Sequence, residues 1–167
     1  MTQLYAQPYD LSATGFYFET REEYSIKSAA LRNDYGEPVE EFEIQFVDGA
    51  ETDCALANAI GLNQANFTQF LSAVDDWDDG EKRAVIIAVG ECGYTFELDL
   101  DPAQFEVVIY ENATMRDLAE QFVEEGLFGE VPEAFQNYID YDAIARDLAV
   151  EYSEIVIAGE NYIYACR

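Results

Sequence analysis

Apolar and polar positions follow two different periods along this chain. The run Phe42-Glu43-Ile44-Gln45-Phe46 alternates strictly, as a β-strand with one buried face does. Shorter patterns of the same kind predict strands over residues 3–7 and 14–19, and a weakly patterned helix is expected over residues 21–33. Together these segments predict a small α+β unit in the first part of the chain.

The middle of the chain has the period of helices instead. One set of residues follows the i, i+3, i+4, i+7 spacing of a buried helix face: Phe67, Phe70, Leu71 and Val74. An earlier helix is expected to have an inward face made of Leu56, Ala57 and Ile60. This earlier helix is expected to be capped by Thr52 or Asp53 and to end at Gly61. The acidic run over residues 75–80 is expected to form a loop.

Residues 84–89 fit two structures. Their valine and isoleucine content favours a buried strand, and residues 90–93 would turn that strand into a partner over residues 94–100. The alternative is an amphipathic helix ended by Gly93, with one face made of Glu81, Ala84, Val85, Ala88 and Val89.

The last third of the chain predicts a second small sheet. A short apolar strand is expected over residues 107–110. Residues 153–158 and 161–166 are predicted to pair as a hairpin through a type II′ turn at Gly159-Glu160. Helices are expected to pack on this sheet.

A helix between these strands is predicted from its first residues. Thr114, followed three positions later by Asp117, forms a capping box. The inward face of the helix is expected to consist of Met115, Leu118, Ala119, Phe122 and Val123. The opposite face has acidic residues about one helical turn (~5.4 Å) apart: Asp117, Glu120 and Glu124.

The run GLFGEVPEAFQNYIDYDAIARDL, which begins at Gly126, has the punctuation of two short helices. Gly126 is placed to end the preceding helix, Pro132 to occupy a first helical position and Asp140 to cap the second helix. One face of the second helix is predicted to be buried: Tyr141, Ile144, Ala145 and Leu148. An ion pair is expected between Asp142 and Arg146. The run is therefore predicted to form a packed helical corner.

The charge of the chain is unusual and evenly spread. There are 35 acidic residues against 8 basic ones, which gives a net charge of −27. Acidic residues exceed basic ones by 10 to 3 in residues 1–50, by 11 to 2 in residues 51–103 and by 14 to 3 in residues 104–167. Duplex DNA has 27 charges in roughly 46 Å of its axis. A folded protein with this charge is repelled by nucleic acid and by anionic membranes, and it is attracted to basic grooves.

Catalytic and cofactor motifs are missing from the sequence. The chain has no histidine and no glycine-rich phosphate-binding motif, and its three cysteines lack metal-ligand spacing. The run that starts at Asp75 fails as a calcium loop because its third position is Trp77. We therefore expect no catalytic, cofactor or metal site and no enzymatic activity. No signal sequence or apolar run of 18 residues is seen, so a cytoplasmic location is expected.

The charge has two interpretations. One is environmental: an acidic, salt-adapted protein-binding domain uses such a surface for solubility and loses its fold at low salt. The other is functional: the surface imitates a nucleic-acid backbone and occupies a basic DNA-binding groove. The second interpretation predicts a stable fold at ordinary ionic strength and binding that weakens steeply with added salt.

The run from Gly126 to Leu148 closely resembles the C-terminal signature of the ArdA antirestriction proteins, and the resemblance extends over roughly residues 106–150. It implies an α+β fold built as an elongated, curved homodimer of small subdomains, here over residues 1–50, 51–103 and 104–167. It also implies mimicry of duplex DNA and inhibition of type I restriction–modification enzymes, without a cofactor. The resemblance further favours a helix for residues 84–89, which we take as the prediction.

The candidate site is a distributed carboxylate surface rather than a pocket. The carboxylates expected to face the methyltransferase core of the restriction–modification enzyme are Asp75, Asp76, Asp78, Asp79, Glu111, Asp117, Glu120, Glu124, Glu125, Glu130, Glu133, Asp140, Asp142 and Asp147. A short apolar strand at a sheet edge pairs readily with a symmetry mate, so the predicted dimer interface is Val107, Val108, Ile109 and Tyr110.

Overall fold

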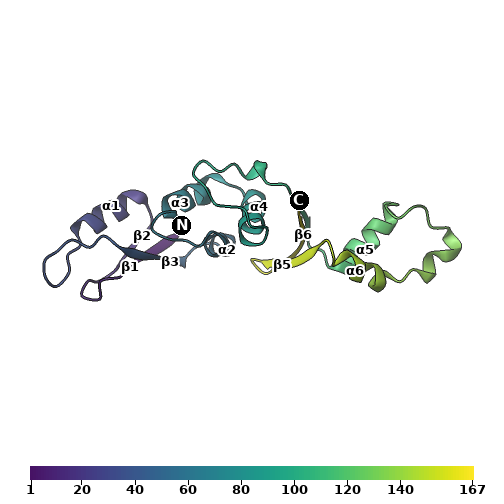
Figure 1. Cartoon of the computed structure of the whole chain (residues 1–167), viewed down its shortest axis with the longest axis horizontal. Coiled ribbons are helices and arrows are strands. Elements are labelled where there is room, and N and C mark those ends of the chain that lie inside the picture. Colours follow the sequence, from purple (N-terminus) through teal and green to yellow (C-terminus); the bar gives the residue numbers. More distant parts are fainter. The chain divides into compact units, whose positions relative to one another are not determined.

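The computed structural model describes residues 1–167 as an α+β fold with two small antiparallel sheets and intervening helices (Figure 1). This confirms the predicted fold class, with a sheet at each end of the chain and helices between them. The chain divides into two compact units, Met1–Phe105 and Glu106–Arg167. We call them the N-terminal unit and the C-terminal unit. The three subdomain boundaries and the elongated shape expected from the resemblance stay predictions.

The N-terminal unit begins with a three-stranded sheet of order β2-β1-β3. Its strands are β1 (Gln3–Pro8), β2 (Phe16–Phe18) and β3 (Phe42–Asp48). Burial alternates along the central strand β1, so the two-residue period of the sequence matches the face that is covered. Helix α1 (Arg21–Ala30) begins at Thr20, whose side chain accepts a hydrogen bond from the backbone N–H of Glu23.

Three helices follow the sheet and share its core. They are α2 (Glu51–Ile60), α3 (Phe67–Asp76) and α4 (Asp79–Gly90), followed by the short 3₁₀ helix η1 (Pro102–Gln104). The rings of Phe18 and Phe67 lie 5.4 Å apart, and those of Phe46 and Phe70 lie 6.3 Å apart. These pairs join the sheet to α3 through aromatic packing.

Residues 84–89, for which the sequence allowed a strand or a helix, lie within helix α4. The predicted helix is confirmed, and it begins with a capping box formed by Asp78 and Glu81. The predicted single buried face is wrong, because the four consecutive residues from Val85 to Ala88 are all buried. α4 packs against both α2 and η1, so more than one of its sides is covered. The second half of α4 is apolar on all its sides, as in a core helix, which explains its strand-like composition.

Two predictions about helix ends in this unit are wrong. Helix α2 begins at Glu51 after Ala50, without a side-chain cap, and Asp53 lies buried in its first turn, where Lys82 pairs with it. The acidic run over residues 75–80 is mostly helical rather than a loop. Helix α3 continues to Asp76 and α4 starts at Asp79, so only two residues separate the helices.

The C-terminal unit is built on a second sheet of order β4-β6-β5. Its strands are β4 (Val107–Glu111), β5 (Ser153–Ile157) and β6 (Glu160–Cys166). Helices α5 (Met115–Glu124) and α6 (Tyr141–Leu148) lie side by side, with the 3₁₀ helix η2 (Glu133–Tyr138) between them in sequence. The core of the unit consists of Leu118, Phe122, Tyr152, Ile163 and Ala165.

The run that starts at Gly126 is less packed than predicted. Gly126, with φ 75°, does follow the end of α5, and Asp140 does cap α6 by accepting from the N–H of Ala143. However, no residue of α6 is fully buried, and four large side chains of this run are more than half exposed: Leu127, Phe128, Phe135 and Tyr138. Pro132 is the N-cap of η2 rather than its first helical residue.

The β5–β6 hairpin is confirmed, but its turn differs from the predicted one. Ile157 pairs with Glu160, so the two turn residues are Ala158 and Gly159. Their φ angles are 52° and 80°, which makes this a type I′ turn instead of type II′. An alanine in the left-handed region is unfavourable because of its Cβ atom.

We expect Ala158→Asn to raise the free energy of unfolding of the C-terminal unit by about 0.5–1 kcal/mol, because Asn-Gly is a preferred type I′ sequence. The change is measured as the shift of the urea midpoint. The exposed Ala134, which has no positive φ, provides the matched control Ala134→Asn. An equal midpoint for Ala158→Asn and the unchanged protein would show that the turn is not strained.

Candidate functional site

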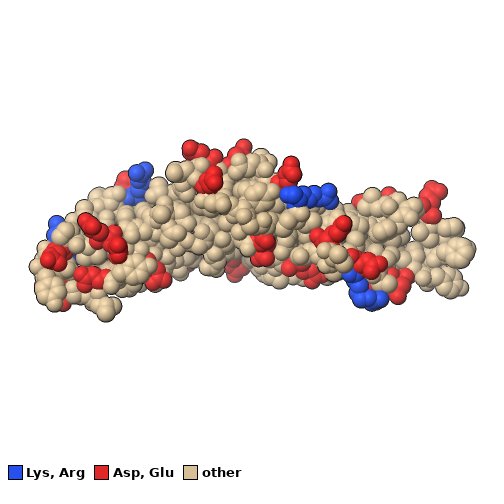
Figure 2. Space-filling view, viewed as in Figure 1, with Lys and Arg blue, Asp and Glu red and all other residues tan.

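The carboxylates of the chain lie at its surface, with one exception. Asp53 is the only buried acidic residue, and Lys82 is the only buried basic residue. The N-terminal unit has 21 acidic residues against 5 basic ones, and the C-terminal unit has 14 against 3. Figure 2 shows acidic side chains spread over both units in this view, with few basic ones among them. Each unit therefore has an acidic surface of its own.

The four predicted carboxylates of the N-terminal unit lie around the junction of α3 and α4, and all are exposed. Asp78 and Asp79 are at the start of α4, where negative charge is favourable. Asp75 and Asp76 are the last residues of α3, where negative charge opposes the helix dipole. The negative charges of Asp75 and Asp76 therefore do not stabilise α3. Asp78, in contrast, stabilises the start of α4 as its N-cap.

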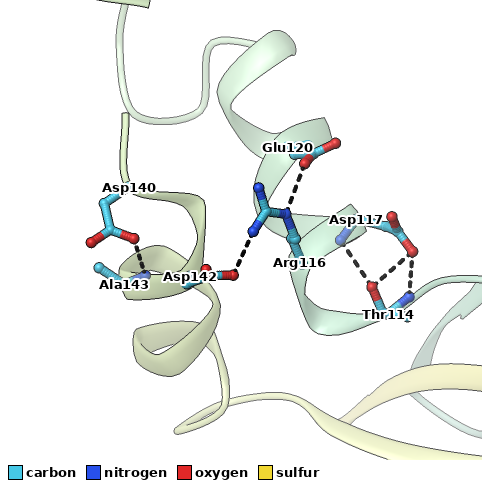
Figure 3. A network of polar contacts seen from close by, with 7 residues as sticks. All are labelled: Thr114, Arg116, Asp117, Glu120, Asp140, Asp142 and Ala143. Atoms are coloured by element: carbon cyan, nitrogen blue, oxygen red, sulfur yellow. Dashed lines mark hydrogen bonds and ion pairs between the residues drawn. The ribbon is translucent and has the colours of Figure 1, made fainter. Parts of the chain in front are cut away.

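In the C-terminal unit, Arg116 draws two predicted carboxylates together (Figure 3). Its guanidinium lies 3.2 Å from Glu120 on the same helix and 2.7 Å from Asp142 on α6. The predicted ion pair between Asp142 and Arg146 is therefore wrong, because Asp142 pairs across the two helices instead. Arg116 also neutralises part of the acidic row along α5, and the Asp142 and Glu120 carboxylates raise the pKa of Arg116.

Asp117 faces away from Arg116 and completes the predicted capping box of α5 (Figure 3). The backbone N–H and the hydroxyl of Thr114 both donate to Asp117 at 2.8 Å, and they hold the pKa of this carboxyl below its ordinary value. A lowered pKa in the folded state means that the contribution of Asp117 to stability is present at neutral pH. It is lost as the pH falls through that lowered pKa. Asp117 thus stays charged.

The remaining predicted carboxylates do not converge on one point. Those placed on α5, on η2, on α6 and on the connections between these helices are exposed: Glu124, Glu125, Glu130, Glu133, Asp140 and Asp147. Glu111 ends β4 and is exposed as well. Glu120 is half-buried beside Arg116. The structure shows these carboxylates dispersed over several elements of the unit, and their role as a binding surface stays a prediction.

Strand β4 lies at the edge of its sheet, because β6 is its only partner strand. All four predicted interface residues are half-buried. Val108 and Tyr110 pack against the core of the C-terminal unit. The edge of β4 that faces away from β6 has no partner strand within the chain, and such an edge can pair with a strand of another molecule.

Sequence reasoning missed the buried ion pair of the N-terminal unit. Lys82 Nζ lies 2.7 Å from Asp53 Oδ1 and donates to the carbonyl of Val74 at 3.1 Å. One signal was present: Lys82 lies three and four positions before Val85 and Ile86, so it shares their side of α4. No neighbouring residue indicated that Asp53 would be buried in an ion pair, because its partner Lys82 is 29 residues away in the sequence.

The structure holds no group of three or more acidic, cysteine or histidine side chains arranged to bind a metal ion. None of its helices is long and apolar enough to span a membrane.

A comparison with known protein families matches the chain to one family. The family model described as "Antirestriction protein (ArdA)" matches residues 5–163, which covers most of both units. A search of curated proteins finds no significant match. The family match covers almost the whole chain and extends well beyond the run that begins at Gly126. The chain therefore belongs to the ArdA family of antirestriction proteins.

Proposed function

We propose that this protein imitates duplex DNA and occupies the basic DNA-binding groove of a type I restriction–modification enzyme. The observation that supports the proposal is the exposure of the acidic side chains: every carboxylate except that of Asp53 is at least partly exposed to solvent. Such a surface attracts a groove that is built to neutralise phosphates. Occupation of the methyltransferase core in the cytoplasm would spare incoming mobile DNA from restriction, without catalysis or a cofactor.

The alternative is an acidic, salt-adapted protein-binding domain that has no part in DNA mimicry. Membership of an antirestriction family favours the mimic. Two carboxylates at the C-terminal end of α3 also favour a surface selected for its negative potential, since Asp75 and Asp76 oppose the dipole of their own helix. A salt-adapted domain loses its fold at low ionic strength, whereas the mimic stays folded there.

A competition experiment tests this function. A labelled DNA duplex is bound to a purified type I methyltransferase at low salt, and the protein is added. We expect it to displace the duplex, and we expect excess unlabelled duplex to displace the protein. Polyglutamate at the same total charge is the control and should displace far less duplex, because it lacks a fixed arrangement of carboxylates. If a large excess of the protein leaves the duplex bound, the proposed function is wrong.

The proposal includes a homodimer formed through the open edge of β4. We expect Ile109→Asp to give monomers in sedimentation analysis, because a carboxylate on this edge opposes pairing with a second strand. Val156→Asp is the matched control, since Val156 is an exposed apolar residue of the opposite edge strand β5 and should leave the dimer intact.

The exposed apolar side chains of the run that begins at Gly126 are the other candidate for the dimer interface, and the same sedimentation analysis tests them. Phe128 is 57% exposed in the run with four exposed large side chains. Monomers from Phe128→Asp, together with an intact dimer for Ile109→Asp, would place the interface on that run and would contradict the role of β4.

A further inference from the structure

A cleft of about 310 Å³ lies in the N-terminal unit between helix α3 and the irregular segment over residues 96–100. Its apolar part includes the rings of Trp77 and Phe96, whose centroids are 6.3 Å apart at an interplanar angle of 82°. Leu98, which is 77% exposed, and the buried Ala73 also line it. We call this the Trp77 cleft. It combines aromatic surface with an open entrance.

The polar part of the Trp77 cleft is negative. Its lining includes the three carboxylates of Asp76, Glu97 and Asp99 and no basic residue. None of these carboxylates forms an ion pair within the chain. Asp76 is the last residue of α3, so the negative end of the helix dipole adds to their potential. The cleft therefore attracts a cation and has no cation of its own.

The chemistry of the lining selects the kind of cation. A guanidinium is planar and weakly hydrated, it stacks on aromatic rings, and its several N–H donors reach more than one carboxylate. An ammonium is more strongly hydrated and binds as a point charge. The aliphatic stem of an arginine also gains contact with apolar walls such as those of Leu98 and Ala73.

We propose that the Trp77 cleft receives an arginine side chain from the basic surface of a partner protein. The guanidinium stacks on the ring of Trp77, with the nearly perpendicular ring of Phe96 beside it, and the surrounding carboxylates accept its hydrogen bonds. The identity of the partner rests on the proposed function, because the DNA-binding groove of a restriction–modification enzyme is a basic surface. The cleft then acts as a local anchor within an otherwise dispersed charge surface.

Trp77 is the only tryptophan of the chain, so its fluorescence reports on this cleft directly. The full-length protein is titrated with a short capped peptide of alternating glycine and arginine. Two matched peptides have lysine or neutral citrulline in place of arginine. We expect a saturable change with the arginine peptide, several-fold weaker binding of the lysine peptide, and no saturation with the citrulline peptide. No change of Trp77 fluorescence at millimolar arginine peptide overturns the proposal, as does equal binding of the citrulline peptide.

Two variants that remove the same number of charges distinguish binding in the Trp77 cleft from general attraction to the negative surface. The cleft variant is Asp76→Asn with Glu97→Gln and Asp99→Asn. Asparagine suits the positive φ of 60° at residue 99. The control variant is Asp34→Asn with Glu41→Gln and Glu43→Gln, three exposed carboxylates of the same unit outside the cleft.

Both variants lose three negative charges, so long-range attraction falls equally. We expect the cleft variant to bind the arginine peptide about tenfold more weakly, and the control variant to change its affinity less than about threefold. Equal weakening by the two variants would show that the peptide responds only to net charge, which overturns the proposal.

The same variants distinguish this proposal from the proposed function. In competition with duplex DNA at the methyltransferase, we expect the cleft variant to be a weaker competitor than the control variant. If both compete equally well with the duplex, the function stands and the anchor is overturned. If neither variant nor the unchanged protein competes while arginine selectivity persists, the cleft proposal stands and its partner is another basic protein.

Discussion

Lys82→Met is expected to lower the free energy of unfolding of the N-terminal unit by roughly 3–5 kcal/mol. The Lys82 and Asp53 side chains are only 9% and 7% exposed, and their charged atoms are 2.7 Å apart. Removal of the ammonium leaves the Asp53 carboxylate buried with only Thr2 as a side-chain donor, at 3.4 Å. An uncompensated buried charge is far more costly than the loss of a surface ion pair, which is worth up to about 1 kcal/mol.

Urea unfolding measures this loss, and two further variants test its cause. Arg21→Met removes an exposed base and should change the free energy of unfolding by no more than about 0.5 kcal/mol. Adding Asp53→Leu to Lys82→Met should recover most of the lost stability, because apolar replacement of a whole buried pair is often close to neutral. If the single and double variants are equally unstable, lost packing rather than the unpaired Asp53 carboxylate is responsible.

Binding to a type I methyltransferase is expected to weaken at least a hundredfold when the salt concentration rises from 50 mM to 200 mM. A groove that neutralises phosphates loses roughly 10³–10⁵ in affinity for DNA over that range when six to ten contacts are made. The carboxylates of this protein lie on several separate elements rather than in one regular row, so we expect a weaker dependence than that of DNA. Isothermal titration at several salt concentrations gives the slope directly.

Stability measured over the same range of salt provides the control. The mimic interpretation predicts that the midpoint of unfolding changes little while the affinity falls. The salt-adapted alternative predicts the reverse, with a fold that strengthens as salt is added and no steep loss of affinity. A change in affinity below about threefold would show that binding depends mainly on apolar contacts, and the distributed carboxylates would lose their proposed role.

Features governed by neighbouring residues could be predicted from the sequence. The Thr114–Asp117 capping box and the Asp140 cap are formed by residues three positions or fewer from their partners, and both are confirmed. The alternation in β3 also matches its burial at Phe42 and Ile44. The exposed carboxylates were predictable as a class, because 35 of them cannot be buried in a chain of this size.

Features governed by distant residues could not be predicted. Arg116 meets Asp142 across 26 positions, so the nearer Arg146 looked like the better partner. α4 has the composition of a buried strand because α2 and η1 both pack against it, and sequence periodicity does not separate a buried strand from a buried helix. The Trp77 cleft depends on the path of an irregular segment, which has no periodic signal at all.

The aspartates that begin helices α4 and α6 have two separable roles. Asp78 and Asp140 each accept a hydrogen bond from a backbone N–H in the first turn, so part of the negative surface also fixes where helices start. Asparagine caps helices about as well as aspartate, whereas alanine costs about 1 kcal/mol at such positions. At these two positions, an alanine substitution therefore removes both the negative charge and the helix cap, so a loss of binding could have either cause. An asparagine substitution removes only the charge, and a loss of binding then reports the contribution of the charge.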